Sequence, residues 1–315
     1  MEQLISQIIL IGSPIIEFLI VNSVYSFVLA GVVLAIKLLY PKLPQSIEYG
    51  LWCVVLVRLI LPNNLSFDYA VINLINPLAQ PIAQSEIIMF IQTSQFLSLF
   101  SDVNLSGISL YSYIFTVWTV VVSLVLVRYL GLRLKLIKML NNSHPIVEYW
   151  PVKCANRWRL NFWIKRRVII IAADKFLSPF TFSFTNPVIF IPRDILETKN
   201  ETLIESIIAH EMAHIKRQDP LWLVLQNLIQ IIYFFNPLVW LIVRQLSCLR
   251  ENLCDEMVLS ANKIKPEDYG KSLLQVLRFN ISGDSKSLLP ACHEPIGLRG
   301  AGAACRRTGV GQSPV

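Results

Sequence analysis

Two histidines and a glutamate stand together in the stretch His210-Glu211-Met212-Ala213-His214. Residues four apart lie one above the other on an α-helix, so His210 and His214 can direct imidazole nitrogens at a single ion. Glu211 lies about 100° further round the helix, where its carboxylate can take a proton from water held by that ion. The HExxH spacing therefore predicts a zinc site for hydrolysis, with two histidine ligands and Glu211 as general base. The alternative is two core or surface histidines that fall four apart by chance.

The residues around this motif predict that it lies on a helix covering 200–219. Asn200 is a suitable N-cap, and Glu201 follows near the positive end of the helix dipole. Apolar residues recur at helical spacing, and Pro220 would end the helix. These apolar positions are Ile204, Ile207, Ile208, Met212 and Ile215.

Two histidines do not complete the site, because catalytic zinc normally has three protein ligands and one open position. Glu251, 37 residues beyond His214 on a predicted helix, is the best remaining candidate. Asp255 lies four residues later on the same face and can accept a hydrogen bond from a ligand imidazole. On spacing alone, the alternative for both acids is a solvated helix face.

Composition indicates a membrane protein, since 54% of the 315 residues are hydrophobic and only 16% are charged. We predict a transmembrane region over 1–130 with helices at about 18–36, 47–62 and 108–127. Lys37 and Lys42 place the end of the first helix in the cytoplasm and the N-terminus outside. Arg58, within the second run, would snorkel or face another helix.

The segment 128–167 carries ten basic residues and one acid, Glu148. This asymmetry next to a membrane helix predicts that the following domain, 131–285, is cytoplasmic. A nucleic-acid-binding patch is the alternative, but the juxtamembrane position already accounts for the charge, so we expect the lipid bilayer and no direct nucleic acid as partner. The six cysteines contain no CxxC pair and indicate free thiols in a reduced compartment.

Short β-strands are predicted at 168–172, 180–184 and 188–191, with a turn at 185–187. An edge strand beside the metal helix could hold an extended substrate peptide, and a purely structural hairpin is the alternative. The run 221–243 has 23 residues without a charge, and hydropathy alone would predict a transmembrane helix. A single crossing would separate Glu251 from the histidines, so we predict a helical hairpin over 221–245. Asn236-Pro237 supplies its turn, and the hairpin is buried against the domain or dips into the membrane.

The combination of HEMAHIKRQDPLW, FFNPLVW and RENLCDEMVL resembles the BlaR/MecR-type integral-membrane zinc metallopeptidases, the β-lactam sensor-transducers. The likeness covers roughly residues 1–285. It implies a mainly α membrane protein with three N-terminal transmembrane helices and a cytoplasmic α+β, gluzincin-like zinc metalloprotease domain that contains a small β-hairpin or sheet. It also implies metal ligands His210, His214 and Glu251, general base Glu211, and Asp255 as a supporting acid.

The resemblance further implies a function in the plasma membrane of a bacterium. A zinc (Zn2+) metalloendopeptidase of this type cleaves a peptide bond in a cytoplasmic repressor and so induces β-lactam resistance genes, and it is compatible with a homodimer. The sequence leaves two alternatives open. One is a general quality-control protease of membrane proteins, and the other is an inactive signalling scaffold that lacks its sensor.

The chain departs from the family pattern in two places. Ser183 stands in the predicted hairpin where the family leads us to expect a glycine. The segment 286–315 is atypical, since five of the chain's 12 glycines fall in its last 19 residues. We therefore expect a C-terminally truncated member of the family whose tail is disordered or frameshifted.

Overall fold

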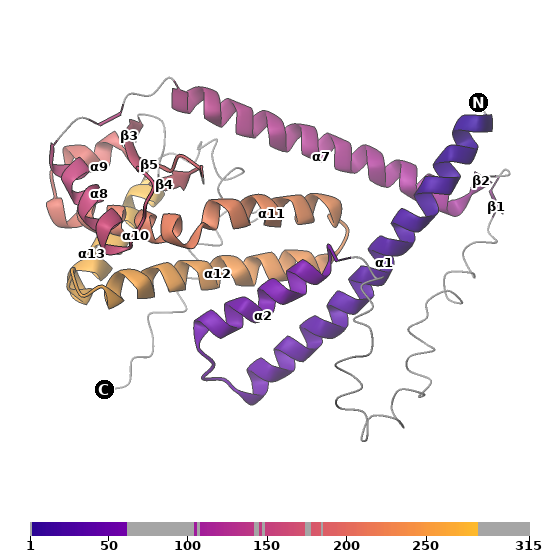
Figure 1. The fold of residues 1–315 in the computed structure, drawn as a ribbon, viewed down its shortest axis with the longest axis horizontal. Coiled ribbons are helices and arrows are strands. Elements are labelled where there is room, and N and C mark those ends of the chain that lie inside the picture. Colours follow the sequence, from indigo (N-terminus) through magenta and orange to yellow (C-terminus); the bar gives the residue numbers. More distant parts are fainter. Residues whose placement is uncertain are drawn as a thin grey trace. The chain divides into compact units, whose positions relative to one another are not determined.

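The computed structural model describes residues 2–61, 104–105, 108–141, 145–146, 149–173, 178–183 and 185–282. The described residues are mainly helical, with a small sheet (Figure 1). They divide into two compact units, one made of the described residues within 1–39 and 53–125, the other of those within 40–52 and 126–315. The predicted tail 286–315 lies outside the described residues.

Two long apolar helices fit a membrane location. Helix α1 (Glu2–Leu39) contains the candidate span Pro14–Leu39, and α7 (Leu110–Asn141) contains the candidate span Tyr111–Lys138. At 1.5 Å per residue, spans of 26 and 28 residues exceed the hydrocarbon thickness of about 30 Å. The predicted crossings at 18–36 and 108–127 fall within or almost within these helices. Before α7, β1 (Asn104–Leu105) pairs antiparallel with β2 (Ile108–Ser109).

The second predicted crossing, 47–62, coincides with the shorter helix α2 (Gln45–Arg58). Its 14 residues extend over about 21 Å, less than the hydrocarbon core, so a third crossing stays a prediction. Of the two arrangements expected for Arg58, snorkelling or facing another helix, the structure shows the second, because Arg58 contacts α1. Its Nη1 donates a hydrogen bond to Asn22 Oδ1 at 2.6 Å, and its guanidinium lies 4.8 Å from the Tyr25 ring centroid.

The sheet of the second unit has the order β3-β5-β4, with β3 (Ile169–Ala173) parallel and β4 (Phe180–Phe182) antiparallel to the central β5 (Val188–Pro192). The three consecutive apolar residues 189–191 of β5 are fully buried, as expected for a central strand. Ser183 directly follows β4 and has φ of 68°. Glycine adopts this left-handed conformation without strain, which is a physical reason to expect a glycine at this position.

Helix α10 (Glu201–Arg217) is the centre of the second unit. It contacts α8 (Tyr149–Asn161), α12 (Pro237–Ser260), α13 (Pro266–Ser282) and β4, and a short α9 (Arg193–Glu197) precedes it. Asn200 is its N-cap, as predicted, with Oδ1 accepting a hydrogen bond from the Leu203 amide at 3.2 Å. Residues 206–215 are all buried, so the metal motif lies inside the core.

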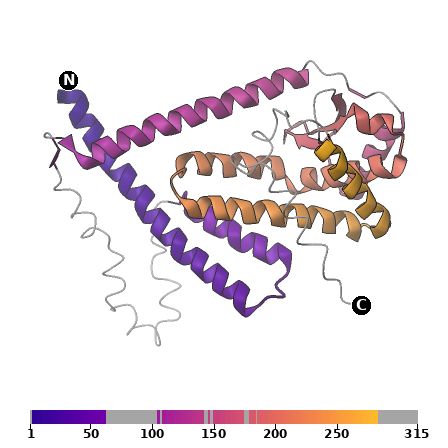
Figure 2. The same cartoon turned by 180° about the vertical axis from the view of Figure 1, so that it is seen from behind.

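Two turns direct the chain away from α10 and back to it. Gln218, at φ 59°, ends α10 and starts α11 (Asp219–Ile232). Asn236 then caps α12, with Oδ1 accepting from the Leu238 amide at 2.9 Å and Pro237 as the first helical residue. Helices α11 and α12 run side by side in opposite directions (Figures 1 and 2). The chain thus reverses at Asn236-Pro237, and α12 returns to contact α10.

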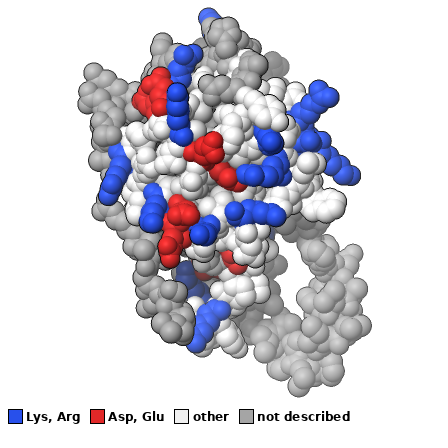
Figure 3. All heavy atoms as spheres, turned by 90° about the vertical axis from the view of Figure 1, so that its left-hand side faces the viewer, with Lys and Arg blue, Asp and Glu red and all other residues white. Residues whose placement is uncertain are grey.

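Basic and acidic side chains are interspersed on the face drawn in Figure 3, which shows no single continuous basic tract among its described residues.

Candidate metal centre

Helix α10 presents the two histidines one turn apart with their rings turned toward each other. The Nε2 atoms of His210 and His214 lie 3.2 Å apart, and the ring planes meet at 81°. Both residues are buried, with 7% and 4% of their surface exposed. The two nitrogens therefore converge on one point inside the protein, as the i, i+4 spacing predicts.

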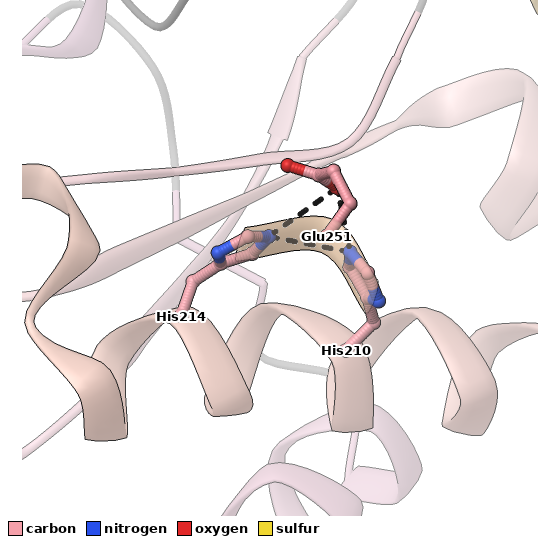
Figure 4. A group of neighbouring side chains, drawn as sticks. All are labelled: His210, His214 and Glu251. Carbon is pink, nitrogen blue, oxygen red and sulfur yellow. Dashed lines mark hydrogen bonds and ion pairs between the residues drawn. The ribbon is translucent and has the colours of Figure 1, made fainter. Parts of the chain in front are cut away.

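Glu251 reaches the same point from α12 (Figure 4). Its Oε2 lies 3.5 Å from Nε2 of His210 and 3.9 Å from Nε2 of His214. Ligands about 2.1 Å from a tetrahedral zinc ion lie about 3.4 Å from one another. The observed separations are close to this value, so the three donor atoms fit a zinc ion that keeps a fourth position open.

Each histidine has a carboxylate at its other ring nitrogen. Asp255 Oδ1 lies 3.0 Å from Nδ1 of His210, and Asp219 Oδ2 lies 2.7 Å from Nδ1 of His214. Tyr269 joins the first pair, since its hydroxyl lies 3.0 Å from the same Nδ1 and donates to Asp255 Oδ1 at 2.7 Å. A carboxylate at Nδ1 favours the tautomer with the proton on that atom, which leaves the Nε2 lone pair for the metal.

The sequence predicted Asp255 for this supporting position but assigned no role to Asp219 or Tyr269. Asp219 is five residues after His214, and residues at this spacing do not lie on the same face of a helix. It reaches the imidazole because Gln218 turns the chain through the left-handed region. Tyr269 comes from α13, and the sequence contained no signal for it beyond a tyrosine near a helix start.

The electrostatics of the group suit a cation. Burial by itself lowers the pKa of His210, but hydrogen bonds to Asp255 and Glu251 and their charges raise it to about 10. Burial raises the pKa of Glu251, but the His210 hydrogen bond and the nearby His214, His210 and Arg250 charges hold it well below its usual range. An ion that binds here must displace a proton from imidazole, so metal binding and proton release are coupled.

Cys254 lies next to this group without joining the three converging donors. Its Sγ is 3.4 Å from Nδ1 of His214 and 3.5 Å from Asp219 Oδ2. Burial, followed by the charges of Asp219 and Glu251, raises the pKa of this thiol well above its usual value. The thiol donates to Asp219 Oδ2 and so supports that carboxylate, and His214, Asp219 and Cys254 form a second group of donor atoms beside the first.

Glu211 points to the sheet side of α10. The residue is 5% exposed, and its Oε2 accepts a hydrogen bond from the Thr181 hydroxyl at 2.6 Å. Thr181 lies on β4, thirty residues earlier in the chain. The edge strand therefore fixes the orientation of the expected general base, a contact that the sequence did not predict.

Arg250 is a further residue of the site. It is 3% exposed, its Nε lies 3.7 Å from Glu251 Oε1, and its Nη2 donates to Ser247 Oγ at 3.0 Å. A buried guanidinium at this position offsets the charge of Glu251 and fixes which of its oxygens faces the histidines.

Residues 17–294 match the family described as BlaR1 peptidase M56. The chain belongs to this family. Among curated relatives, the methicillin resistance mecR1 protein of Staphylococcus aureus (strain Mu50) is 25% identical over 271 residues, covering 82% of the chain and 46% of the relative. The regulatory protein BlaR1 of Bacillus licheniformis is 29% identical over 181 residues, covering 57% and 30%. This M56 chain thus spans about half or less of the length of these relatives.

Proposed function

We propose that this M56 chain is the membrane-bound zinc metalloendopeptidase part of a BlaR1/MecR1-type signal transducer. Its substrate is a cytoplasmic repressor, and cleavage induces β-lactam resistance genes. One observation carries the proposal: Nε2 of His210, Nε2 of His214 and Oε2 of Glu251 converge with separations of 3.2, 3.5 and 3.9 Å. The names of the relatives, a methicillin resistance protein and a regulatory protein, support the signalling role.

The residues of the site divide the chemistry between them. His210, His214 and Glu251 would hold zinc, which when bound supplies a Lewis acid that acidifies water and polarises the substrate carbonyl. Glu211 accepts a proton from the attacking water and passes it to the leaving amine. Thr181 keeps the Glu211 carboxylate in one orientation throughout.

The proposed topology follows from the charge pattern. The N-terminus is external and three helices cross the plasma membrane. The domain after residue 130 is cytoplasmic, because the segment 128–167 carries ten basic residues and only one acid. A cytoplasmic position gives the site access to a repressor. Labelling of single cysteines near Gln245 from outside intact cells would contradict this topology, since the residue then lies on the external side.

The decisive experiment uses the purified full chain in lipid nanodiscs with a candidate repressor. We expect cleavage that stops when a zinc chelator is added and resumes when zinc is returned. Glu211→Gln should keep zinc and lose cleavage, because its amide cannot accept the proton, whereas His210→Ala should lose the metal. Glu201→Gln, at the exposed start of the same helix, is the matched control. Undiminished proteolysis by Glu211→Gln would refute the enzymatic proposal.

A further inference from the structure

The segment 221–243, which we name the apolar hairpin, comprises most of α11, the turn at 233–236 and the start of α12. None of its 23 residues is Asp, Glu, Lys, Arg or His. Asp219 and Arg244 are the charged residues nearest to its two ends. Because the hairpin returns to where it started, both ends lie at the same level.

The hairpin exposes several large apolar side chains and buries its amide side chains, together with other apolar residues of both helices. Large apolar residues with exposed side chains lie along both helices and at the turn: Leu221 42%, Leu228 37%, Ile232 37%, Phe235 47% and Leu241 42%. Amide side chains lie on the buried side: Gln226 0%, Asn227 0%, Gln230 1% and Asn236 2%. A helix pair in water also buries an apolar stripe, but its exposed face carries the amides rather than large apolar residues.

The turn satisfies its own polar groups. The Trp240 indole donates to the Phe234 carbonyl at 3.1 Å, and Asn236 Oδ1 accepts from the Leu238 amide at 2.9 Å. The Tyr233 backbone amide donates to the Ile229 carbonyl of α11 at 2.8 Å, and the Asn236 amide donates to the Tyr233 carbonyl at 2.9 Å. In water such groups can bond to solvent, whereas in hydrocarbon each must find a partner inside the protein.

We infer that the apolar hairpin inserts into the hydrocarbon region of the bilayer as a re-entrant element. The turn with Phe235 is its deep end, the exposed leucines and isoleucine contact acyl chains, and the amides face the protein interior. From Leu221 to Ile232 the helix rises about 17 Å, so the hairpin enters a core of about 30 Å without crossing it.

The insertion has a consequence for the metal centre. Asp219, directly before the hairpin, contacts His214, and α12 continues without a break from Pro237 to Glu251. The proposed zinc site therefore lies at the membrane surface, and the substrate is bound there. This location adds to the proposed function, but its test requires neither zinc nor cleavage.

The experiment uses the full chain reconstituted in vesicles of phosphatidylcholine and phosphatidylglycerol. A genetically encoded spin-labelled amino acid is placed at Leu228 or Phe235, and at Glu256 as the control, an exposed position of α12 beyond the hairpin. We expect labels at 228 and 235 to collide more with oxygen, which concentrates in lipid, than with a water-soluble nickel chelate. The label at 256 should show the reverse. If the label at 228 prevents reconstitution, Leu241 offers a second lipid-facing position.

Two results would overturn the inference. Free access of the nickel chelate to 228, 235 and 241 in vesicles would place the hairpin in water. Exclusion of both oxygen and nickel, in vesicles and in detergent alike, would mean that protein covers the hairpin, either another partner or a second copy of the chain. Recovery of oxygen access on dilution in detergent would identify the second copy.

Discussion

Replacement of Asp219 by asparagine tests whether the carboxylate behind His214 controls metal affinity. Asp219 is 1% exposed, with Oδ2 2.7 Å from Nδ1 of His214 and Oδ1 3.4 Å from Nε of Arg217. Burial raises the pKa of Asp219, but the His214 hydrogen bond and the charges of His214, Arg217 and Arg250 lower it overall, so the carboxylate is ionised at neutral pH. Asparagine keeps the volume and removes this charge.

The expected loss follows from what the carboxylate does for the ligand. Removing the hydrogen-bond partner of a metal-binding histidine typically costs 10–100-fold in metal affinity, which is about 1.4–2.8 kcal/mol. We expect Asp219→Asn at the upper end of this range, because the carboxylate is buried and close. Asp255→Asn should reduce the zinc affinity by a smaller factor, because the Asp255 side chain is 25% exposed and Tyr269 also contacts His210.

The assay is competition for zinc between the purified chain and a fluorescent chelator at constant pH. Asp194→Asn, at an exposed acid of α9, is the matched control and should bind zinc like the unmodified chain. Circular dichroism checks that each variant keeps its helices. Unchanged zinc affinity in a folded Asp219→Asn chain would refute the reasoning, and so would a larger loss for Asp255→Asn than for Asp219→Asn.

Two further predictions concern the contacts around the site. Thr181→Val removes the hydroxyl that donates to Glu211 at 2.6 Å. A hydrogen bond to a charged group contributes about 1.5–3 kcal/mol, so kcat for repressor cleavage should fall by about 10–100-fold with KM and zinc content unchanged. Thr181→Ser should restore it, and equal activity of the valine and serine variants would contradict a positioning role. Asn236→Ala removes the N-cap of α12 and should lower the free energy of unfolding by at least about 1 kcal/mol, the typical value for a cap in water. Denaturant titration beside Asn161→Ala, an exposed control at the end of α8, measures the difference, and equal midpoints would count against the cap.

The sequence by itself determined the features that depend on local spacing. The four-residue interval between His210 and His214, the cap at Asn200 and the two apolar helices each follow from helix geometry or from hydrophobic length. The strands near 169–173, 180–182 and 188–192 were also predictable, because each is a short run of β-branched and aromatic residues, with turn residues between the runs. Glu251 required one more step, since catalytic zinc needs a third donor and Glu251 lies on a predicted helix with Asp255 four residues later on the same face.

Only the tertiary structure decided which distant residues meet. Thr181 contacts Glu211 because β4 pairs with β5 at an edge beside α10, and the parallel pairing of β3 with β5 was not predicted. Asp219 contacts His214 because one residue, Gln218, adopts a left-handed conformation. Local spacing is fixed by the covalent geometry of a helix, whereas these contacts depend on how whole elements pack. The same applies to the apolar hairpin: the sequence shows that it is uncharged, but only the structure shows that its amides are buried while Leu221, Leu228 and Leu241 are exposed.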